Sequence, residues 1–198
     1  MSHSQHIEIE YKNMLEQHEF EKAAAFLQVK PADFFLQENH YFDTPDFKLK
    51  DKMSALRIRF KNGTYEMTLK QPADEGLLET NIELSQTEAD ACMQTGSIPD
   101  GHIKEALEIM KIPAAELEYF GSLSTKRAEK AYNGGLMVLD HSSYLNCEDY
   151  ELEYEVSDSE KGKKEFILFL KLLNIPERKT ENKIKRFYRQ KLNMNTAE

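Results

Sequence analysis

Charged side chains recur at every second position in several short segments of this sequence. Residues 8–12 read Glu-Ile-Glu-Tyr-Lys, and glutamates occupy positions 151, 153 and 155. Successive side chains of a β-strand point to opposite faces, so the charges within each segment would share one face. A single surface strand often alternates in this way. The recurrence over several strands, with acidic and basic strands separate, indicates a shared charged site.

The residue types in these segments suggest a particular chemistry. Carboxylates without His or Cys suit hard cations such as Mg²⁺ or Mn²⁺, and Arg and Lys suit phosphate oxygens. The candidate metal ligands are Glu8, Glu10, Glu151 and Glu153. The candidate phosphate ligands are Lys12, Arg57, Arg59, Lys70, Arg127, Lys183 and Lys185. Together they predict a site for a complex of a polyphosphate with metal, and metal-assisted attack on phosphorus.

Periodicity and turn residues predict the elements that position these side chains. We expect strands at 7–12, near 40–43, and at 54–61, 65–71, 78–84, 117–127, 136–141 and 150–156. We expect helices at 14–27, from 85 to about 94, and at 102–110, 164–173 and 181–192. Asn62-Gly63 is a hairpin signal, and Ser85 with Glu88 is typical of a capping box. About eight antiparallel strands predict one α+β domain built on a β-barrel or sandwich.

The bulk composition excludes several classes of function. The chain has 198 residues, is 40% hydrophobic and carries a net charge of −9, so it can bury a core but lacks the basic surface of a general DNA-binding protein. Cys92 and Cys147 are too few for a disulfide framework or a zinc site. No apolar stretch approaches the roughly 18 residues that span a membrane, and the N-terminus has no apolar signal core. We therefore expect a soluble cytoplasmic protein with no DNA or membrane partner.

Taken in order, these segments resemble the CYTH superfamily, also called the triphosphate tunnel metalloenzymes. Residues 8–12 are similar to the ExExK signature of that superfamily. Later segments of the superfamily are similar to the following parts of this chain: Tyr41–Pro45, Leu56–Arg59, Thr68–Lys70, Lys126-Arg127, Leu139-Asp140, Tyr150–Glu155 and Asn182–Lys185. The ordered match runs over nearly the whole chain. It most resembles the stand-alone members from bacilli, which are often labelled adenylate cyclases.

The resemblance implies a fold and assigns roles within it. The implied fold is a closed antiparallel eight-stranded β-barrel, the triphosphate tunnel, with flanking helices. One CYTH domain would cover residues 1–198, with C-terminal helices from about residue 160 packing on the barrel. The resemblance implies that phosphate is held by Lys12, Arg57, Arg59, Lys70, Arg127 and one of Lys183 or Lys185. It implies that metal is held by Glu8, Glu10, Glu151 and Glu153, with Asp140 as a further ligand.

Three functions are compatible with this set of residues. The leading one is an Mg²⁺- or Mn²⁺-dependent triphosphatase that acts on inorganic triphosphate or a small organic triphosphate, as a monomer or homodimer. Water would be the nucleophile, activated by a metal or by a lysine with a lowered pKa, and Lys12 and Lys70 are the candidate catalytic residues. The alternatives are a class IV-type adenylyl cyclase that makes cyclic AMP and pyrophosphate, and a non-catalytic polyphosphate- or nucleotide-binding protein.

Overall fold

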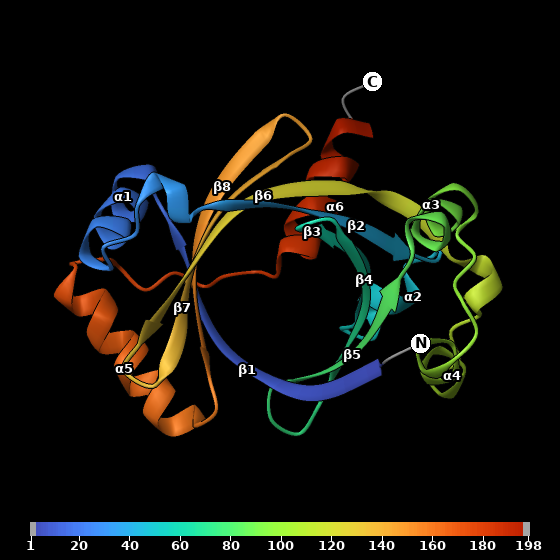
Figure 1. Cartoon of the computed structure of the whole chain (residues 1–198), viewed down its shortest axis with the longest axis horizontal. Coiled ribbons are helices and arrows are strands. Elements are labelled where there is room, and N and C mark those ends of the chain that lie inside the picture. Colours follow the sequence, from blue (N-terminus) through green and yellow to red (C-terminus); the bar gives the residue numbers. More distant parts are fainter. Residues whose placement is uncertain (1–2, 196–198) are drawn as a thin grey trace. The chain divides into compact units, whose positions relative to one another are not determined.

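Eight antiparallel strands form the framework of the computed structural model, which describes residues 3–195 (Figure 1). The strands are β1 (His3–Leu15), β2 (Phe35–Asp43), β3 (Ala55–Lys61), β4 (Thr64–Pro72), β5 (Leu77–Leu84), β6 (Glu118–Tyr132), β7 (Gly135–Tyr144) and β8 (Cys147–Val156). They form a closed barrel in the order β1-β5-β4-β3-β2-β6-β7-β8. The closed eight-stranded barrel implied by the resemblance is therefore confirmed.

The helices flank these strands. They are α1 (Gln17–Phe26), α2 (Lys48–Asp51), α3 (Gln86–Thr95), α4 (His102–Ile109), α5 (Ser159–Leu172) and α6 (Lys183–Asn195). Two short 3-10 turns, Pro31–Asp33 and Ala114–Glu116, complete the described elements. Between residues 3 and 195, no helix has the length and apolar character needed to cross a lipid bilayer.

The described residues divide into two compact units. Unit 1 comprises residues 3–7 and 37–123, and unit 2 comprises residues 8–36 and 124–195. Unit 1 contains strands β2 to β5 with helices α2 to α4, and unit 2 contains most of β1 and β6 together with β7, β8, α1, α5 and α6. Each unit has its own hydrophobic core.

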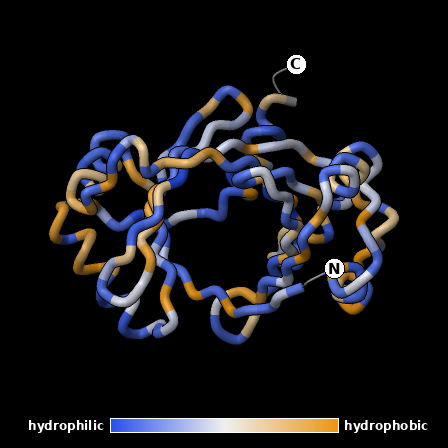
Figure 2. Tube along the Cα trace, in the orientation of Figure 1, coloured by the Kyte–Doolittle hydropathy of each residue, from blue (hydrophilic) through white to orange (hydrophobic). Residues whose placement is uncertain are grey.

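The core of unit 1 lies on one face of β3, β4 and β5. Leu56, Ile58, Met67, Leu69 and Ile82 are buried there against residues of α3 and α4. Because these apolar residues alternate with polar ones, the intervening side chains lie on the opposite face of the same strands. Figure 2 shows this change between hydrophobic and hydrophilic residues along the strands.

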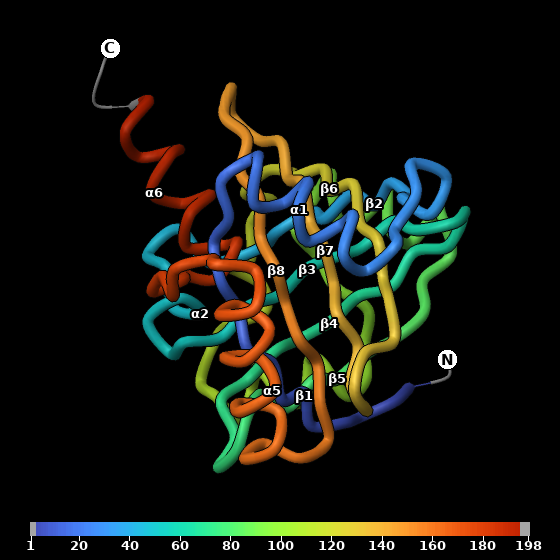
Figure 3. The backbone as a smooth tube through the Cα atoms, turned by 90° about the vertical axis from the view of Figure 1, so that its left-hand side faces the viewer, coloured from blue at the N-terminus to red at the C-terminus, as the bar shows by residue number. Residues whose placement is uncertain are grey.

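The core of unit 2 follows the same rule. Leu139 of β7 and Leu152 and Tyr154 of β8 pack with Phe20 of α1 and Phe169 of α5. Figure 3 shows α5 running beside β8, in agreement with the contacts between these elements. The charged residues that alternate with this apolar set therefore occupy the face of β7 and β8 that the two helices leave uncovered.

Two turn signals in the sequence have the expected geometry. Asn62 and Gly63 have φ values of 53° and 82°, and they join β3 to β4 as a two-residue hairpin turn that requires positive φ at both positions. Ser85 caps α3, since its hydroxyl accepts a hydrogen bond from the Glu88 N–H and the Glu88 carboxylate accepts one from the Ser85 N–H. Both predictions are confirmed.

One local prediction differs from the structure. The helix expected at 14–27 is wrong at Met14 and Leu15, which extend β1 and pair with Glu151 and Tyr150 of β8. Leu15 fits a helix by its spacing, but pairing with β8 buries it in the core of unit 2. Between β2 and α2, the buried Asp43 carboxylate accepts hydrogen bonds from the backbone N–H groups of Leu49 and Lys50, which fixes the start of that helix.

Candidate active site

The strand register of unit 2 brings together charged residues from distant parts of the sequence. Lys12 of β1 lies opposite Glu153 of β8, and Asp140 of β7 lies opposite both Glu151 of β8 and Arg127 of β6. Residues directly opposite one another in antiparallel strands share a face, so all five side chains lie on the polar face of unit 2. Every one of them is a predicted site residue.

Arg127 connects two carboxylates on this face. Its guanidinium donates two hydrogen bonds to Asp140, at 2.8 and 2.6 Å, and a third to Glu153 at 2.8 Å. Burial alone would lower the pKa of Arg127, but the charges of Asp140 and Glu153 raise it well above its ordinary value. The bidentate pair fixes the position of the Asp140 carboxylate, and the third hydrogen bond fixes that of Glu153.

Lys12 joins the same cluster from β1. Its ammonium lies 2.7 Å from a carboxylate oxygen of Glu10 and 3.5 Å from one of Glu153. Burial alone would lower the pKa of Lys12, but Glu153, Glu10 and Glu151 raise it above its ordinary value. Lys12 therefore carries a positive charge in the ligand-free protein.

Helix α6 supplies two further cations. The Lys183 ammonium lies 2.7 Å from Asp140, 2.8 Å from Glu151 and 2.6 Å from Glu153. Arg186 donates a 2.7 Å hydrogen bond to Glu151. We name Glu10, Lys12, Arg127, Asp140, Glu151, Glu153, Lys183 and Arg186 the acidic–basic cluster.

The helix also distinguishes between the candidates of the basic segment. Lys185 is exposed on α6, outside the acidic–basic cluster, whereas Lys183 lies within it. Arg186 is absent from the predicted set although it is buried beside Glu151 and Asp149. Its position three residues after Lys183 is the signal that indicates a shared helix face.

The segment that leads into α6 is fixed to β1. The Asn13 carboxamide accepts a 2.6 Å hydrogen bond from the Arg178 N–H and donates one of 3.0 Å to the Pro176 carbonyl. Met14 N–H donates to the Thr180 hydroxyl at 3.0 Å. These contacts hold residues 176–180 in place and thereby position the first turn of α6.

Two further glutamates extend the polar face of unit 2. Glu155 lies opposite Glu10 in the pairing of β1 with β8, and Glu8 is two residues from Glu10 on the same strand. Burial, together with the charges of Glu153, Glu8 and Glu10, raises the pKa of Glu155 to about 7, although the charge of Arg127 acts in the opposite direction. The ordinary value is 4.5, so the native protein retains this proton at pH values where the unfolded chain has lost it.

Replacing Glu155 with glutamine is expected to stabilise the protein at pH 8 and not at pH 4. The raised pKa means that folding stability falls as pH rises from about 4.5 to about 7, and the penalty remains above that range. Allowing for solvent screening of this half-buried group, the gain at pH 8 is about 1–2 kcal/mol. Urea unfolding with chelator at both pH values measures it, and the exposed Glu177→Gln variant is the control. An equal change at both pH values would contradict the shifted pKa.

The remaining predicted phosphate residues belong to unit 1. Arg57 and Arg59 of β3 lie on the face opposite the core, where Arg59 donates a 3.2 Å hydrogen bond to Asn39 and Lys70 pairs with Glu79. The Nε of Arg57 is buried and has no hydrogen-bond partner among the described residues. A buried donor without an acceptor is unfavourable, and an anionic oxygen would satisfy it.

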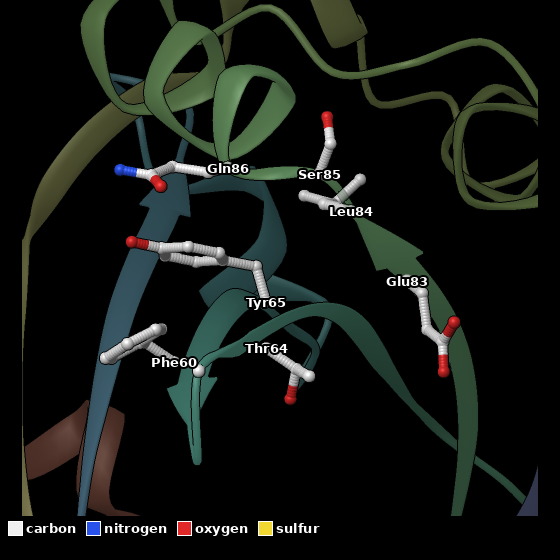
Figure 4. Close-up of a pocket in the computed structure, with 8 residues that line it drawn as sticks. Phe60, Thr64, Tyr65, Glu83, Leu84, Ser85 and Gln86 are labelled. Atoms are coloured by element: carbon white, nitrogen blue, oxygen red, sulfur yellow. The ribbon is translucent and has the colours of Figure 1, made fainter.

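Unit 1 also contains a pocket of about 500 Å³ at the hairpin between β3 and β4 (Figure 4). Phe60 and Tyr65 line it with ring centroids 4.7 Å apart, and Leu84, Ser85 and Gln86 complete part of the wall. None of the predicted phosphate or metal residues lines this pocket. It therefore adds nothing to the charged site.

The carboxylate oxygens of unit 2 are the type of ligand atom that a hard divalent cation prefers. Four carboxylates share the acidic–basic cluster, and Oε1 of Glu151 is buried without a hydrogen-bond partner among the described residues. Residues 3–195 contain no ready-made group of three or more His, Cys, Asp or Glu side chains spaced around a metal position. The Lys183 ammonium lies among Asp140, Glu151 and Glu153.

Comparison with known proteins places this site in a family. Residues 6–188 match the model of the CYTH domain. The chain is 52% identical over 188 residues to the Bacillus subtilis (strain 168) protein named "Putative triphosphatase YjbK", covering 95% of this chain and 97% of that protein.

Two solved structures are similar over most of their length. One is the crystal structure of "a putative adenylate cyclase (bh2851)" from Bacillus halodurans, with a TM-score of 0.90, 45% identity and coverage of 93% of this chain and 98% of that one. The other is HpAC1 from Hippeastrum, described as a "putative adenylyl cyclase" with a dominant triphosphatase activity, at a TM-score of 0.76, 25% identity and coverage of 92% and 95%. On its sequence and its barrel alike, this chain belongs to the CYTH domain family.

Proposed function

We propose that this protein is a divalent-metal-dependent triphosphatase that hydrolyses inorganic triphosphate or a small organic triphosphate. The observation that carries the proposal is the acidic–basic cluster, in which buried carboxylates suited to metal alternate with cations suited to phosphate. The names of YjbK and HpAC1 support the same reaction class.

Each unit has its own part in the proposal. In unit 2, Glu8, Glu10, Asp140, Glu151 and Glu153 are the proposed metal ligands, and Mg²⁺ or Mn²⁺ is the proposed cation. A bound divalent cation would polarise phosphoryl oxygens and offset their negative charge. The proposed phosphate ligands are Lys12, Arg127 and Lys183 in unit 2 and Arg57, Arg59 and Lys70 in unit 1.

The charge state of Lys12 defines its proposed role. Its pKa is raised, after the lowering effect of burial, by Glu153, Glu10 and Glu151, so Lys12 holds its proton. A protonated lysine stabilises negative charge on the transferring phosphoryl group and its leaving group but does not accept a proton from water. We therefore propose an electrostatic role for Lys12, and Lys70 is kept as the second candidate for the activation of water.

Phosphate release tests the proposal. Inorganic triphosphate, ATP and thiamine triphosphate are each incubated with protein and Mg²⁺ or Mn²⁺, with chelator as the control, and cyclic AMP is assayed in the ATP reaction. We expect release of one phosphate that depends on the metal, and the fastest substrate names the subclass. Triphosphate binding without turnover of any substrate would contradict the proposal and favour a binding protein.

The cyclase is the second candidate, supported by the description of the Bacillus halodurans structure. In this reaction the 3′-hydroxyl of ATP replaces water as the nucleophile. Cyclic AMP together with pyrophosphate in the ATP reaction would favour the cyclase over the triphosphatase. The pocket with Phe60 and Tyr65 does not favour the cyclase, since no predicted phosphate residue lines that pocket.

A further inference from the structure

Lys183 lies among three of the carboxylates that are proposed metal ligands. Its ammonium lies within 2.8 Å of one oxygen each from Asp140, Glu151 and Glu153. The ammonium donates a hydrogen bond to Glu153, and it forms ion pairs with Asp140 and Glu151. The Asp140 and Glu151 side chains are fully buried, and only 12% of the Lys183 side chain is exposed.

A divalent cation and this ammonium exclude one another. Mg²⁺ takes oxygen ligands at about 2.0–2.1 Å, which would draw the same three carboxylates around the metal. A second positive group at the centre of that set would be repelled strongly, because the low-dielectric interior screens charge poorly. Metal binding at these carboxylates therefore requires Lys183 to leave them.

Lys183 is less rigidly held than Arg127 in the acidic–basic cluster. Arg127, on strand β6, is held by a bidentate pair of hydrogen bonds to Asp140 of β7. Lys183 is the first residue of α6. The backbone N–H groups of Lys185 and Arg186 donate hydrogen bonds to the carbonyl of Asn182, which precedes the helix. The positive end of the helix dipole disfavours an ammonium at that position. Its flexible four-carbon stem allows the charge to move while the helix stays in place.

We propose that Lys183 is an exchangeable internal counter-ion: it neutralises the carboxylates in the ligand-free protein and transfers to a polyphosphate oxygen when metal enters. This inference rests on the proposed function, because it assigns the same carboxylates to metal. A polyphosphate gives the displaced ammonium a new partner, so each ligand strengthens the binding of the other by the same factor. Metal and triphosphate binding are thereby coupled through one side chain.

Metal affinity without turnover tests this exchange. Free Mn²⁺ is measured by electron paramagnetic resonance in metal-stripped wild-type protein, Lys183→Met and Lys179→Met, where Lys179 is exposed just before α6. We expect Lys183→Met to bind Mn²⁺ about tenfold or more tightly than wild type, since the competing charge is gone, and Lys179→Met to match wild type. Equal affinity in Lys183→Met and wild type would overturn the exchange and leave the triphosphatase proposal intact. Absence of Mn²⁺ binding in all three proteins would instead contradict the metal site itself.

A labelling experiment in the wild-type protein keeps the inference testable if Lys183→Met fails to fold. Reductive methylation followed by mass spectrometry is carried out with chelator, and again with saturating Mg²⁺. We expect modification of Lys183 to increase with metal by about tenfold, because the amine leaves its three carboxylates. Lys179 serves as the internal reference and should not change. Unaltered labelling of Lys183 in protein shown to hold metal would overturn the proposal.

Discussion

Replacing Arg127 with methionine is expected to lower the free energy of unfolding of the metal-free protein by about 3–5 kcal/mol. The guanidinium makes three hydrogen bonds, two to Asp140 and one to Glu153, and all three side chains are buried. Its removal leaves carboxylates in the interior with less compensating charge, which is far more unfavourable than the loss of an exposed ion pair. Urea unfolding in the presence of chelator measures the change.

The neighbouring residue provides a matched control for this variant. Lys126 precedes Arg127 on β6, carries the same charge and is exposed, so Lys126→Met should change stability by less than about 0.5 kcal/mol. The double variant Arg127→Met with Asp140→Asn should recover part of the loss, because it also removes one of the unpaired charges. A loss below about 1 kcal/mol in Arg127→Met would show that the buried network contributes little net stability.

The arrangement of the acidic–basic cluster follows from simple alternation in the strands. Spacing of two residues was enough to predict that Glu151 and Glu153 share a face, and that Arg57 and Arg59 share another. Asn62-Gly63 and the Ser85 capping box were equally predictable, because each is a local signal with a defined backbone geometry. Such features need no knowledge of the rest of the chain.

Features that depend on distant parts of the chain could not be predicted in this way. The spacing of Leu15 fits a helix as well as a strand, and only pairing with Tyr150 decides between them. The sequence contains both Lys183 and Lys185, but the contacts of the first turn of α6 decide which one meets the carboxylates. Those contacts depend on Asn13, which is 165 positions from Arg178.

The pairing of the buried carboxylates with Lys183 could not be predicted from local sequence patterns. Alternation indicated acidic strands and basic strands as separate groups, with a bound ligand and metal completing the pairing. In the structure, Asp140, Glu151 and Glu153 also pair with Lys183, a residue at least 30 positions away in sequence. This internal pairing offsets part of the unfavourable free energy of burying several carboxylates.

Replacing Glu10 with glutamine is expected to reduce triphosphate turnover on the order of 100-fold or more. Glu10 is one of the proposed metal ligands, and a carboxylate oxygen of Glu10 lies 2.7 Å from the Lys12 ammonium. Glutamine keeps the shape and one acceptor oxygen for Lys12, but it removes the negative charge that a divalent cation requires. Lys12 also retains its contact with Glu153, so the loss of stability should stay near about 1 kcal/mol. The initial rate at saturating metal measures the effect on turnover.

The same Glu10→Gln variant separates an enzyme from a binding protein. Because the proposed phosphate ligands are unchanged, binding of inorganic triphosphate measured with chelator should remain within a few fold of wild type. An enzyme then loses turnover while it keeps phosphate binding, whereas a pure binding protein would show only a shift in the metal dependence of binding. The exposed Glu177→Gln variant controls for the loss of one negative charge. Equal turnover in Glu10→Gln and wild type would remove Glu10 from the set of metal ligands and leave Glu8 together with Asp140, Glu151 and Glu153, the three carboxylates that Lys183 contacts.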